Sequence, residues 1–217
     1  MNKRAQIPDW CLQRPKSFLQ KLVDLIGAPL RMVLLPDGTC ERFHLTSLRG
    51  ERLAVVLPEV QGRLLDVGAG DNQLVALYKK FDSPAEPEPS VGVDVVDWGS
   101  EYILVKRSDD LPFSDASFDT VTFVACLNHI SERAGALIEA FRLLRPNGRV
   151  VVTMIGPLIG KVGHALWWYS EDKHRDVDEH EEMGMSPASV IGLFAGRRFH
   201  KHPTDFVCLR AESSIRG

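Results

Sequence analysis

The chain has 217 residues, of which 44% are apolar and 25% charged, and its 26 basic and 29 acidic side chains leave a formal net charge of −3. These proportions are those of a soluble globular protein and exclude disordered, collagen-like and disulfide-scaffold classes. The near-neutral charge gives no electrostatic footprint for nucleic acid, so we expect no nucleic-acid partner. No apolar run reaches the roughly 18 residues that a transmembrane helix needs, so we expect no membrane span.

Four cysteines lie far apart in the sequence and form no C-x-x-C pair: Cys11, Cys40, Cys126 and Cys208. This pattern is typical of reduced thiols and not of disulfide staples or a zinc site. The N-terminus also lacks the apolar core of a signal peptide. The sequence therefore predicts a cytoplasmic protein, and it gives no indication of the oligomeric state.

The first 60 residues predict a helical extension and not a separate domain. Phe18, Leu22 and Ile26 recur at i, i+4 and i+8, which predicts a helix with one buried face. A second mixed segment covers residues 47–57 and stops at a proline. We expect both segments to belong to this extension.

From residue 61, short apolar runs alternate with helical segments. The expected strands are 63–67, 91–96, 102–105, 120–125 and 149–155, the expected helices 74–81, 132–144 and 188–195, and two closing strands 198–202 and 205–209. Strands alternating with helices predict a parallel sheet with helices on both faces, and Val-rich runs without polar alternation fit strands buried on both sides. We expect residues 61–217 to form one α/β domain, a doubly wound, mostly parallel, Rossmann-like sheet of seven strands with an antiparallel C-terminal edge strand.

A glycine-rich turn follows the first of these strands, in the sequence Asp66-Val67-Gly68-Ala69-Gly70-Asp71-Asn72. Such a turn opens a helix and lets a ligand approach the backbone at the helix N-terminus. A dinucleotide fingerprint requires a third glycine at position 73, where this chain has Gln73, so pyrophosphate binding is disfavoured. Taken alone, the segment also fits an ordinary turn between a strand and a helix.

Residues further along the chain add to this pattern. The second strand ends in Asp94, whose carboxylate can accept hydrogen bonds from both hydroxyls of a ribose beside the glycine turn. Leu111-Pro112-Phe113, Ser117-Phe118-Asp119 and Leu144-Arg145-Pro146-Asn147-Gly148 follow in that order. In this order and at these separations, residues 61–155 resemble the class I S-adenosylmethionine-dependent methyltransferases, in particular the small-molecule group that includes the ubiquinone/menaquinone methyltransferases.

The resemblance implies an enzyme that uses S-adenosyl-L-methionine to methylate a small-molecule acceptor or a glycan- or lipid-like one. It implies that Asp66, Gly68 and Gly70 line the methionine end of the cofactor. It places residues 128–130 where the cofactor and acceptor sites meet, with His129 as a candidate base. The cofactor-binding residues that it implies are, in full, Asp66, Gly68, Ala69, Gly70, Asn72, Asp94, Val95, Asp109, Asp110 and Leu111.

Three positions depart from the family pattern. The third glycine of the turn is replaced by Asn72, a residue type that tolerates positive φ better than other non-glycine residues. The usual adenine-side acid is replaced by Arg107, which leaves Asp109 as the nearest candidate to bond the adenine amino group. The turn before the fifth strand has Asn147 where a second glycine is usual.

Residues 171–182 are densely charged and have three alternative interpretations. They can form a solvated loop, a lid over the acceptor with His174 or His180 as general base, or a metal site built from these histidines and neighbouring carboxylates. An imidazole pKa near neutrality suits a general base, whereas the spacings match no metal-ligand motif. We expect a lid over residues 171–185 and no metal.

Two alternatives from other functional classes stay open. A catalytically silent partner subunit would keep the fold and the cofactor without turnover, and Asn72 and Arg107 would then be signs of decay. A nicotinamide-dependent oxidoreductase would use the same sheet, although Gln73 counts against it. The fold alone does not separate these functions, because function depends on the site.

Overall fold

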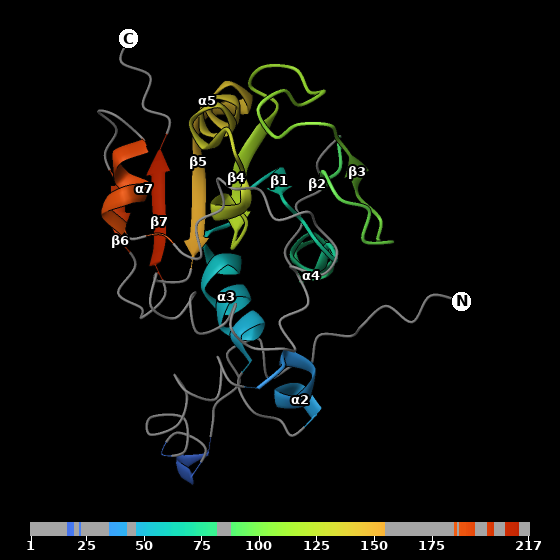
Figure 1. The fold of residues 1–217 in the computed structure, drawn as a ribbon, viewed down its shortest axis with the longest axis vertical. Helices are drawn as coiled ribbons and strands as arrows, with labels where there is room; N and C mark the ends of the chain where they lie inside the picture. Colours follow the sequence, from blue (N-terminus) through green and yellow to red (C-terminus); the bar gives the residue numbers. More distant parts are fainter. Residues whose placement is uncertain are drawn as a thin grey trace.

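A central β-sheet organises the chain (Figure 1). The computed structural model describes residues 17–19, 22, 35–42, 47–81, 88–154, 185, 187–193, 199–201 and 207–212. The strands are β1 (Leu64–Val67), β2 (Val91–Asp94), β3 (Ile103–Leu104), β4 (Phe118–Val124), β5 (Leu144–Met154), β6 (Phe199–Lys201) and β7 (Val207–Glu212). The helices are α2 (Asp37–Arg42), α3 (Leu48–Val56), α4 (Gln73–Phe81), α5 (Arg133–Leu143) and α7 (Pro187–Leu193), with short 3-10 turns η2 (Leu57–Glu59) and η3 (Leu127–His129).

The strands lie in the order β3-β2-β1-β4-β5-β7-β6. Strands β3, β2, β1, β4 and β5 pair in parallel, so the predicted Rossmann-like parallel sheet is confirmed. From β1 the chain first builds outward through β2 and β3, then returns to the other side of β1 to build β4 and β5. This reversal creates a switch point at the carboxyl ends of β1, β2 and β4, where ligands bind in open α/β sheets.

The C-terminal segments extend the sheet beyond β5. Strand β7 runs antiparallel to β5, with Val151 opposite Arg210, and β6 runs antiparallel to β7. Strand β5 itself begins at Leu144, five residues earlier than expected, and continues through the predicted turn. Asn147 takes a φ of 64° there, within the stretch where the register between β4 and β5 shifts from Phe118 opposite Leu144 to Thr120 opposite Arg149.

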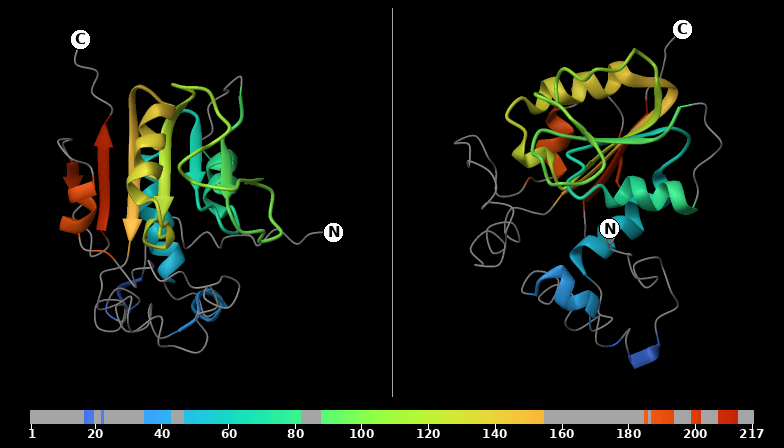
Figure 2. Two further views of the ribbon diagram at one scale, coloured as in Figure 1. Left: turned by 45° about the horizontal axis from the view of Figure 1, so that its top comes forward. Right: turned by 90° about the vertical axis from the view of Figure 1, so that its right-hand side faces the viewer.

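Helices cover both faces of the sheet, with α5 on one side and α4 on the other in the right-hand view of Figure 2. Successive side chains of a strand point to opposite faces. Leu64 accordingly packs in one apolar cluster with residues of α3 and α4, whereas Leu65 packs in another with residues of α5 and α7. Both side chains are fully buried. This two-sided burial explains the continuous apolar runs of the sequence.

The N-terminal part of the chain agrees with the expected helices only in part. The expected helix over residues 47–57 is α3, which is capped by Ser47, whose Oγ accepts a hydrogen bond from the Gly50 N–H at 2.9 Å. The buried face expected for the earlier segment is wrong for the described residues, because Phe18 is 83% exposed and Leu22 is 43% exposed. Ile26 lies outside the described residues.

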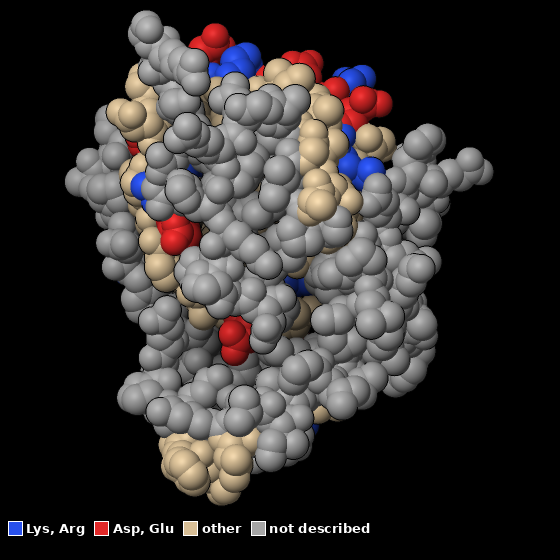
Figure 3. Space-filling view, turned by 90° about the vertical axis from the view of Figure 1, so that its left-hand side faces the viewer, with Lys and Arg blue, Asp and Glu red and all other residues tan. Residues whose placement is uncertain are grey.

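Two observations bear on the expected partners. None of the helices that the structure describes is long and apolar enough to cross a membrane. On the face shown in Figure 3, the described basic and acidic side chains lie interspersed. The expected absence of a nucleic-acid partner stays a prediction.

Candidate functional site

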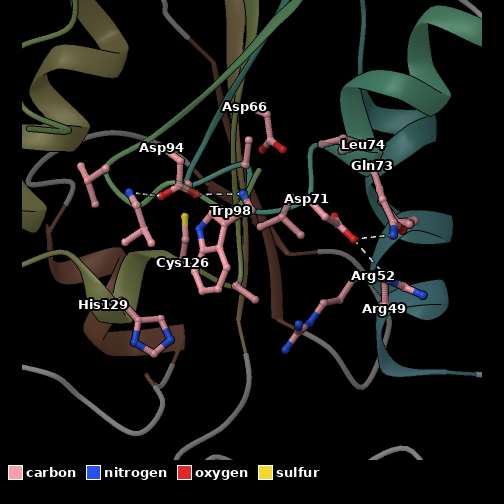
Figure 4. Close-up of a pocket in the computed structure, with 18 of the residues that line it drawn as sticks. Arg49, Arg52, Asp66, Asp71, Gln73, Leu74, Asp94, Trp98, Cys126 and His129 are labelled. Carbon is pink, nitrogen blue, oxygen red and sulfur yellow. Dashed lines mark hydrogen bonds and ion pairs between the residues drawn. The ribbon is translucent and has the colours of Figure 1, made fainter. Parts of the chain in front are cut away.

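A cavity of about 480 Å³ opens at the switch point of the sheet (Figure 4). Its described lining comes mainly from the ends of β1, β2 and β4 and the loops that follow them, and from α3, with single residues of α2 and of the loop after β3, and the start of α4. Pockets that hold drug-sized ligands and cofactors measure roughly 300–1,000 Å³. The cavity therefore has the size and the position of a cofactor site.

The glycine turn after β1 forms the back of this cavity. Gly68 and Gly70 adopt φ values of +70° and +55°, in the left-handed region that favours glycine. The N–H groups of Gly68 and Ala69 both donate to the Val93 carbonyl oxygen, at 2.9 and 3.0 Å, which ties the turn to β2. A Cβ atom on Gly68 would lie 2.6 Å from the Cβ of Cys126. The turn is therefore held close to β2 and β4, and position 68 has no space for a side chain.

Asn72 occupies the place of the family's third glycine and adopts a φ of 57°. The expectation that asparagine would tolerate this conformation agrees with the structure. Its Nδ2 donates to the Glu101 carbonyl oxygen, and its side chain packs beside Gly92. Asn72 does not line the cavity, so its observed role is to hold the turn against the loop after β2.

Asp94 stands at the cavity wall, where β2 ends, and is only 7% exposed. Its Oδ2 accepts a hydrogen bond from the Gly70 N–H at 2.8 Å, and its Oδ1 accepts one from the Val96 N–H at 3.0 Å. An ionised carboxylate has about four lone-pair sites. Asp94 is thus fixed by two backbone donors and can still accept two hydrogen bonds from a ligand.

Asp66 lies deeper in the same cavity and is 2% exposed. Its pKa is raised from the ordinary 3.8 to about 7, mainly by burial. A hydrogen bond from the Thr122 hydroxyl at 2.6 Å opposes this rise, and the nearby carboxylates of Asp94 and Asp71 add to it. Burial disfavours the charged form of a carboxyl group. A buried acid that titrates near neutrality is typical of a functional site and suits a ligand with positive charge.

We expect Asp66→Asn to stabilise the protein at pH 8 and to have little effect near pH 4. The folded pKa lies above the unfolded one, so the cost of charging Asp66 is absent below about pH 4 and fully present above pH 7. A difference of three pKa units corresponds to about 4 kcal/mol. Asparagine keeps the oxygen that accepts from Thr122 and carries no charge. Urea unfolding at a series of pH values measures the effect, with the exposed Asp97→Asn as control; an equal gain at both ends of the series would contradict it.

The side of the cavity formed by α3 carries two arginines. Arg49 pairs with Asp71, with 3.3 Å between Nη1 and Oδ2, and Asp71 also accepts a hydrogen bond from Gln73. Arg52 is different: its Nε and Nη2 are buried and have no hydrogen-bond partner within the described part of the chain. Two nitrogens of the Arg52 guanidinium are therefore left without a hydrogen bond by the residues that the structure describes, in a cavity that also contains buried acids.

His129 follows β4 in η3 and lies on the opposite side of the cavity from Arg49 and Asp71 (Figure 4). Its Nε2 lies 3.0 Å from the Nδ2 of Asn128. An amide nitrogen only donates, so Nε2 accepts in this arrangement, and the proton of the neutral ring is on Nδ1. His129 would have to release Asn128 to take up a proton at Nε2.

The structure brings some of the predicted residues together and leaves others apart. Lining the cavity are Asp66, Gly68, Ala69, Gly70, Asp94, Val95 and His129. Asp109 instead pairs with Arg107, at 2.7 Å from Nε to Oδ1, and this pairing lowers the pKa of Asp109. Asp110 and Leu111 are also absent from the described lining. The residue of their loop that lines the cavity is Ser108. The assignment of these three residues to the cofactor stays a prediction.

The predicted lid falls outside the described residues. His174 and His180 belong to it, so both candidate bases stay predictions. Within the described ranges, no group of three or more His, Cys, Asp or Glu side chains is placed to hold a metal ion.

Among the cavity residues that the sequence analysis missed are Arg49, Arg52, Trp98 and Cys126. The two arginines carried a signal, because they lie three residues apart on a helix and therefore share one face of it. Cys126 donates from its thiol to the Val67 carbonyl oxygen at 2.9 Å, a contact between residues 59 positions apart. Nothing in the local sequence indicates that contact.

The comparison with protein families identifies the central part of the chain. Residues 65–152 match the family described as Methyltransferase domain. This part of the chain is similar to a methyltransferase domain. The match includes the glycine turn, Asp94 and the end of β4, which are the elements that form the cavity.

Curated relatives of the methyltransferase domain are themselves methyltransferases. A ubiquinone/menaquinone biosynthesis C-methyltransferase of Geotalea daltonii is 29% identical over 109 residues, which are 42% of this chain and 44% of the relative. A 27-O-demethylrifamycin SV methyltransferase of Amycolatopsis mediterranei is 28% identical over 148 residues, 63% of this chain and 54% of the relative. The chain spans about half the length of these relatives.

Solved structures of methyltransferases share the fold. A SAM-dependent methyltransferase of Thermotoga maritima is 19% identical, with a TM-score of 0.54 over 89% of this chain and 97% of the other. One from Mesorhizobium loti is 16% identical, with a TM-score of 0.53 over 76% of this chain and 100% of the other. The predicted resemblance to class I S-adenosylmethionine-dependent methyltransferases is confirmed, and S-adenosyl-L-methionine as the expected cofactor agrees with it.

Proposed function

We propose that the protein is a methyltransferase that transfers a methyl group from S-adenosyl-L-methionine to a small-molecule acceptor. One observation supports this above the others: the Asp94 carboxylate is fixed at the cavity wall by the N–H groups of Gly70 and Val96. A fixed acceptor at the end of β2, beside a glycine turn, suits a ribose diol. The second candidate function is a silent partner subunit with the same cofactor site.

The residues of the cavity fit this cofactor. The glycine turn presents its backbone to the cavity, and Asp94 can accept hydrogen bonds from the ribose hydroxyls. Asp66 adds a buried carboxyl group whose pKa of about 7 suits the positive charge of this cofactor. When bound, the cofactor supplies a methyl group on a positively charged sulfur. The protein contributes mainly alignment, because holding the reactants in line replaces a bimolecular encounter.

An acceptor that carries a proton of high pKa also needs a base. We propose His129, His174 and His180 as the candidates. His129 has support from its place on the cavity, and it can act once Nε2 leaves Asn128. His174 and His180 are proposed only through the expected lid over residues 171–185.

The acceptor is proposed as a class. The names of the relatives concern quinone biosynthesis and rifamycin SV, which favours a small organic molecule or a lipid-like one over a macromolecule. A glycan-like acceptor belongs to the same proposal. No nucleic-acid partner is proposed, since the net charge is −3.

Titration of the protein with S-adenosylmethionine by calorimetry tests the function. We expect saturable binding, and we expect NADH to produce no energy transfer from the tryptophans. A tritium-transfer screen with labelled cofactor and cell extract then tests turnover. Cofactor binding without transfer to any acceptor would favour the silent subunit, and binding of NADH alone would favour the oxidoreductase.

The domain organisation is part of the proposal. We propose that residues 61–217 form one methyltransferase domain, in which the antiparallel pairing of β5, β7 and β6 supplies the C-terminal edge of a seven-stranded sheet. Residues 1–60 are proposed as a helical extension, supported by α2 and α3. The cytoplasmic location stays a prediction from the cysteine pattern.

A further inference from the structure

The buried side chain of Asn128 contacts His129, the candidate base of the cavity. Asn128 belongs to η3, is 8% exposed, and is not among the described residues that line the cavity. His129 does line the cavity, on the same side as Cys126 (Figure 4). The Nδ2 of Asn128 lies 3.0 Å from the Nε2 of His129. A buried amide therefore holds one ring nitrogen of a histidine that lines the cavity.

The turn that carries both residues is fixed from two directions. Within η3, the His129 N–H donates to the Cys126 carbonyl oxygen at 2.9 Å. From α5, the guanidinium of Arg133 donates to the carbonyl oxygens of Leu127 and Asn128, at 3.3 and 3.0 Å. The backbone beneath the amide and the imidazole is thus held in place, so that the two side chains meet in a defined geometry.

The contact between these side chains selects one form of the imidazole. A neutral imidazole carries its proton on one nitrogen and accepts a hydrogen bond through the other. The amide nitrogen of Asn128 only donates, so it pairs with an Nε2 that carries no proton. The hydrogen bond at one ring nitrogen decides the protonation of the other, so the ring proton is on Nδ1. Asn128 thereby keeps the Nε2 lone pair of His129 as an acceptor.

An acceptor molecule that brings its own N–H or O–H group suits this form of the ring. Such a group can take the place of the amide N–H, because both donate to the same lone pair on Nε2. A carbonyl or ether oxygen only accepts, and it would need a proton on Nε2 instead. Before the acceptor binds, the amide of Asn128 therefore occupies the position of the acceptor's donor group.

We propose that Asn128 is a positioning residue that fixes His129 in the Nδ1–H tautomer, so that Nε2 takes the proton of a hydroxyl or amine acceptor. This inference rests on the proposed function and deepens it, because it gives the chemical class of the acceptor. In the transfer step, the acceptor oxygen or nitrogen forms a bond to the methyl carbon. The bond from that carbon to sulfur breaks and leaves its electron pair on sulfur. The proton of the acceptor passes to Nε2, and its bonding pair stays on the acceptor atom.

Nitrogen NMR of the His129 ring tests the tautomer without any acceptor. Correlations between the ring nitrogens and the carbon-bound ring protons show which nitrogen carries the proton, and the spectrum of His129→Gln identifies the signals. At pH 8 an ordinary imidazole is neutral, and we expect the proton on Nδ1 in the unaltered chain. Asn128→Asp should move it to Nε2, because a carboxylate only accepts. Asn128→Leu should reduce the fraction of the Nδ1–H form, because leucine offers no N–H to Nε2.

Binding and transfer measurements separate positioning from cofactor binding. Asn128→Leu changes no charge, and calorimetry should show its affinity for S-adenosylmethionine within about twofold of the unaltered chain. In the tritium-transfer assay with cell extract, Asn128→Asp should lower turnover about tenfold or more, because Nε2 then carries a proton. The label should be found on oxygen or nitrogen of the product. The matched control is Asn147→Asp, the same change at an exposed position of β5 outside the described lining, which should leave the tautomer and turnover unaltered.

Three results would overturn the inference. The first is a proton on Nε2 in the unaltered chain, which would mean that the amide presents its oxygen to the ring. The second is the same tautomer in the unaltered chain, Asn128→Leu and Asn128→Asp, with thermal unfolding showing that the variants fold. The third is a label found on carbon. Failure of the unaltered chain to bind S-adenosylmethionine would instead overturn the proposed function, whatever the tautomer of His129.

Discussion

Asp94→Ala should weaken the binding of S-adenosylmethionine by about a hundredfold or more. The carboxylate accepts from two backbone N–H groups and is left with lone pairs for two ribose hydroxyls. Two charge-assisted hydrogen bonds contribute roughly 2–4 kcal/mol, which corresponds to this factor. Calorimetry on the purified variant measures the change.

The control for Asp94 is Asp97→Ala, an exposed acid of the same loop that does not line the cavity. It should bind with unaltered affinity. Removal of Asp94 also frees the N–H groups of Gly70 and Val96, so thermal unfolding must accompany the titration. Unchanged affinity in a folded Asp94→Ala variant would mean that the ribose is placed wrongly.

Gly68→Val should abolish cofactor binding and reduce stability. A Cβ at this position would meet Cys126 at 2.6 Å, and a branched side chain at a φ of +70° is strained in any surroundings. Overpacking alone costs about 1–3 kcal/mol, and left-handed strain adds a similar amount. Urea unfolding and calorimetry measure the two effects separately.

Gly70→Ala separates strain from contact. Gly70 has a φ of +55°, but a Cβ there would meet nothing within 4 Å. We expect it to lose only about 1 kcal/mol of stability. At Gly192 a Cβ would also meet nothing within 4 Å, and the φ is not positive, so Gly192→Ala should lose no stability through either steric contact or backbone strain. Retained binding in Gly68→Val would show that the turn has a purely structural role.

The sheet and the glycine turn could be predicted because their signals are local. Strands buried on both faces read as continuous apolar runs, and the turn residues are adjacent in sequence. Asp94 was singled out for the same reason, since it lies in an apolar run, although the strand was expected to reach residue 96 and β2 ends at Asp94. The helix at 47–57 was also found correctly from its composition. Its role beside the cavity was not.

The rest depended on contacts between distant residues. Arg52 reaches the cavity only because α3 packs on the sheet beside α4, a tertiary arrangement that no local pattern encodes. Ser108 lines the cavity while Asp109 turns toward Arg107, an outcome that the pairing of two charges decides. Phe18 and Leu22 have helical spacing but are exposed. The spacing of apolar residues predicts an apolar face on a helix, but it does not show which part of the protein covers that face.

The hydrogen bond from the Gly70 N–H to Asp94 has a consequence for the kinetics of binding. It joins the loop after β1 to the last residue of β2, 24 residues further along the chain, before any ligand arrives. The Asp94 carboxylate and the glycine turn, which meet the ligand, are therefore preorganised. A ligand that enters a preorganised site loses little loop entropy on binding, and its association needs no slow rearrangement of the protein. The glycine turn and Asp94 are held together by the fold itself, through the pairing of β1 with β2 and this hydrogen bond.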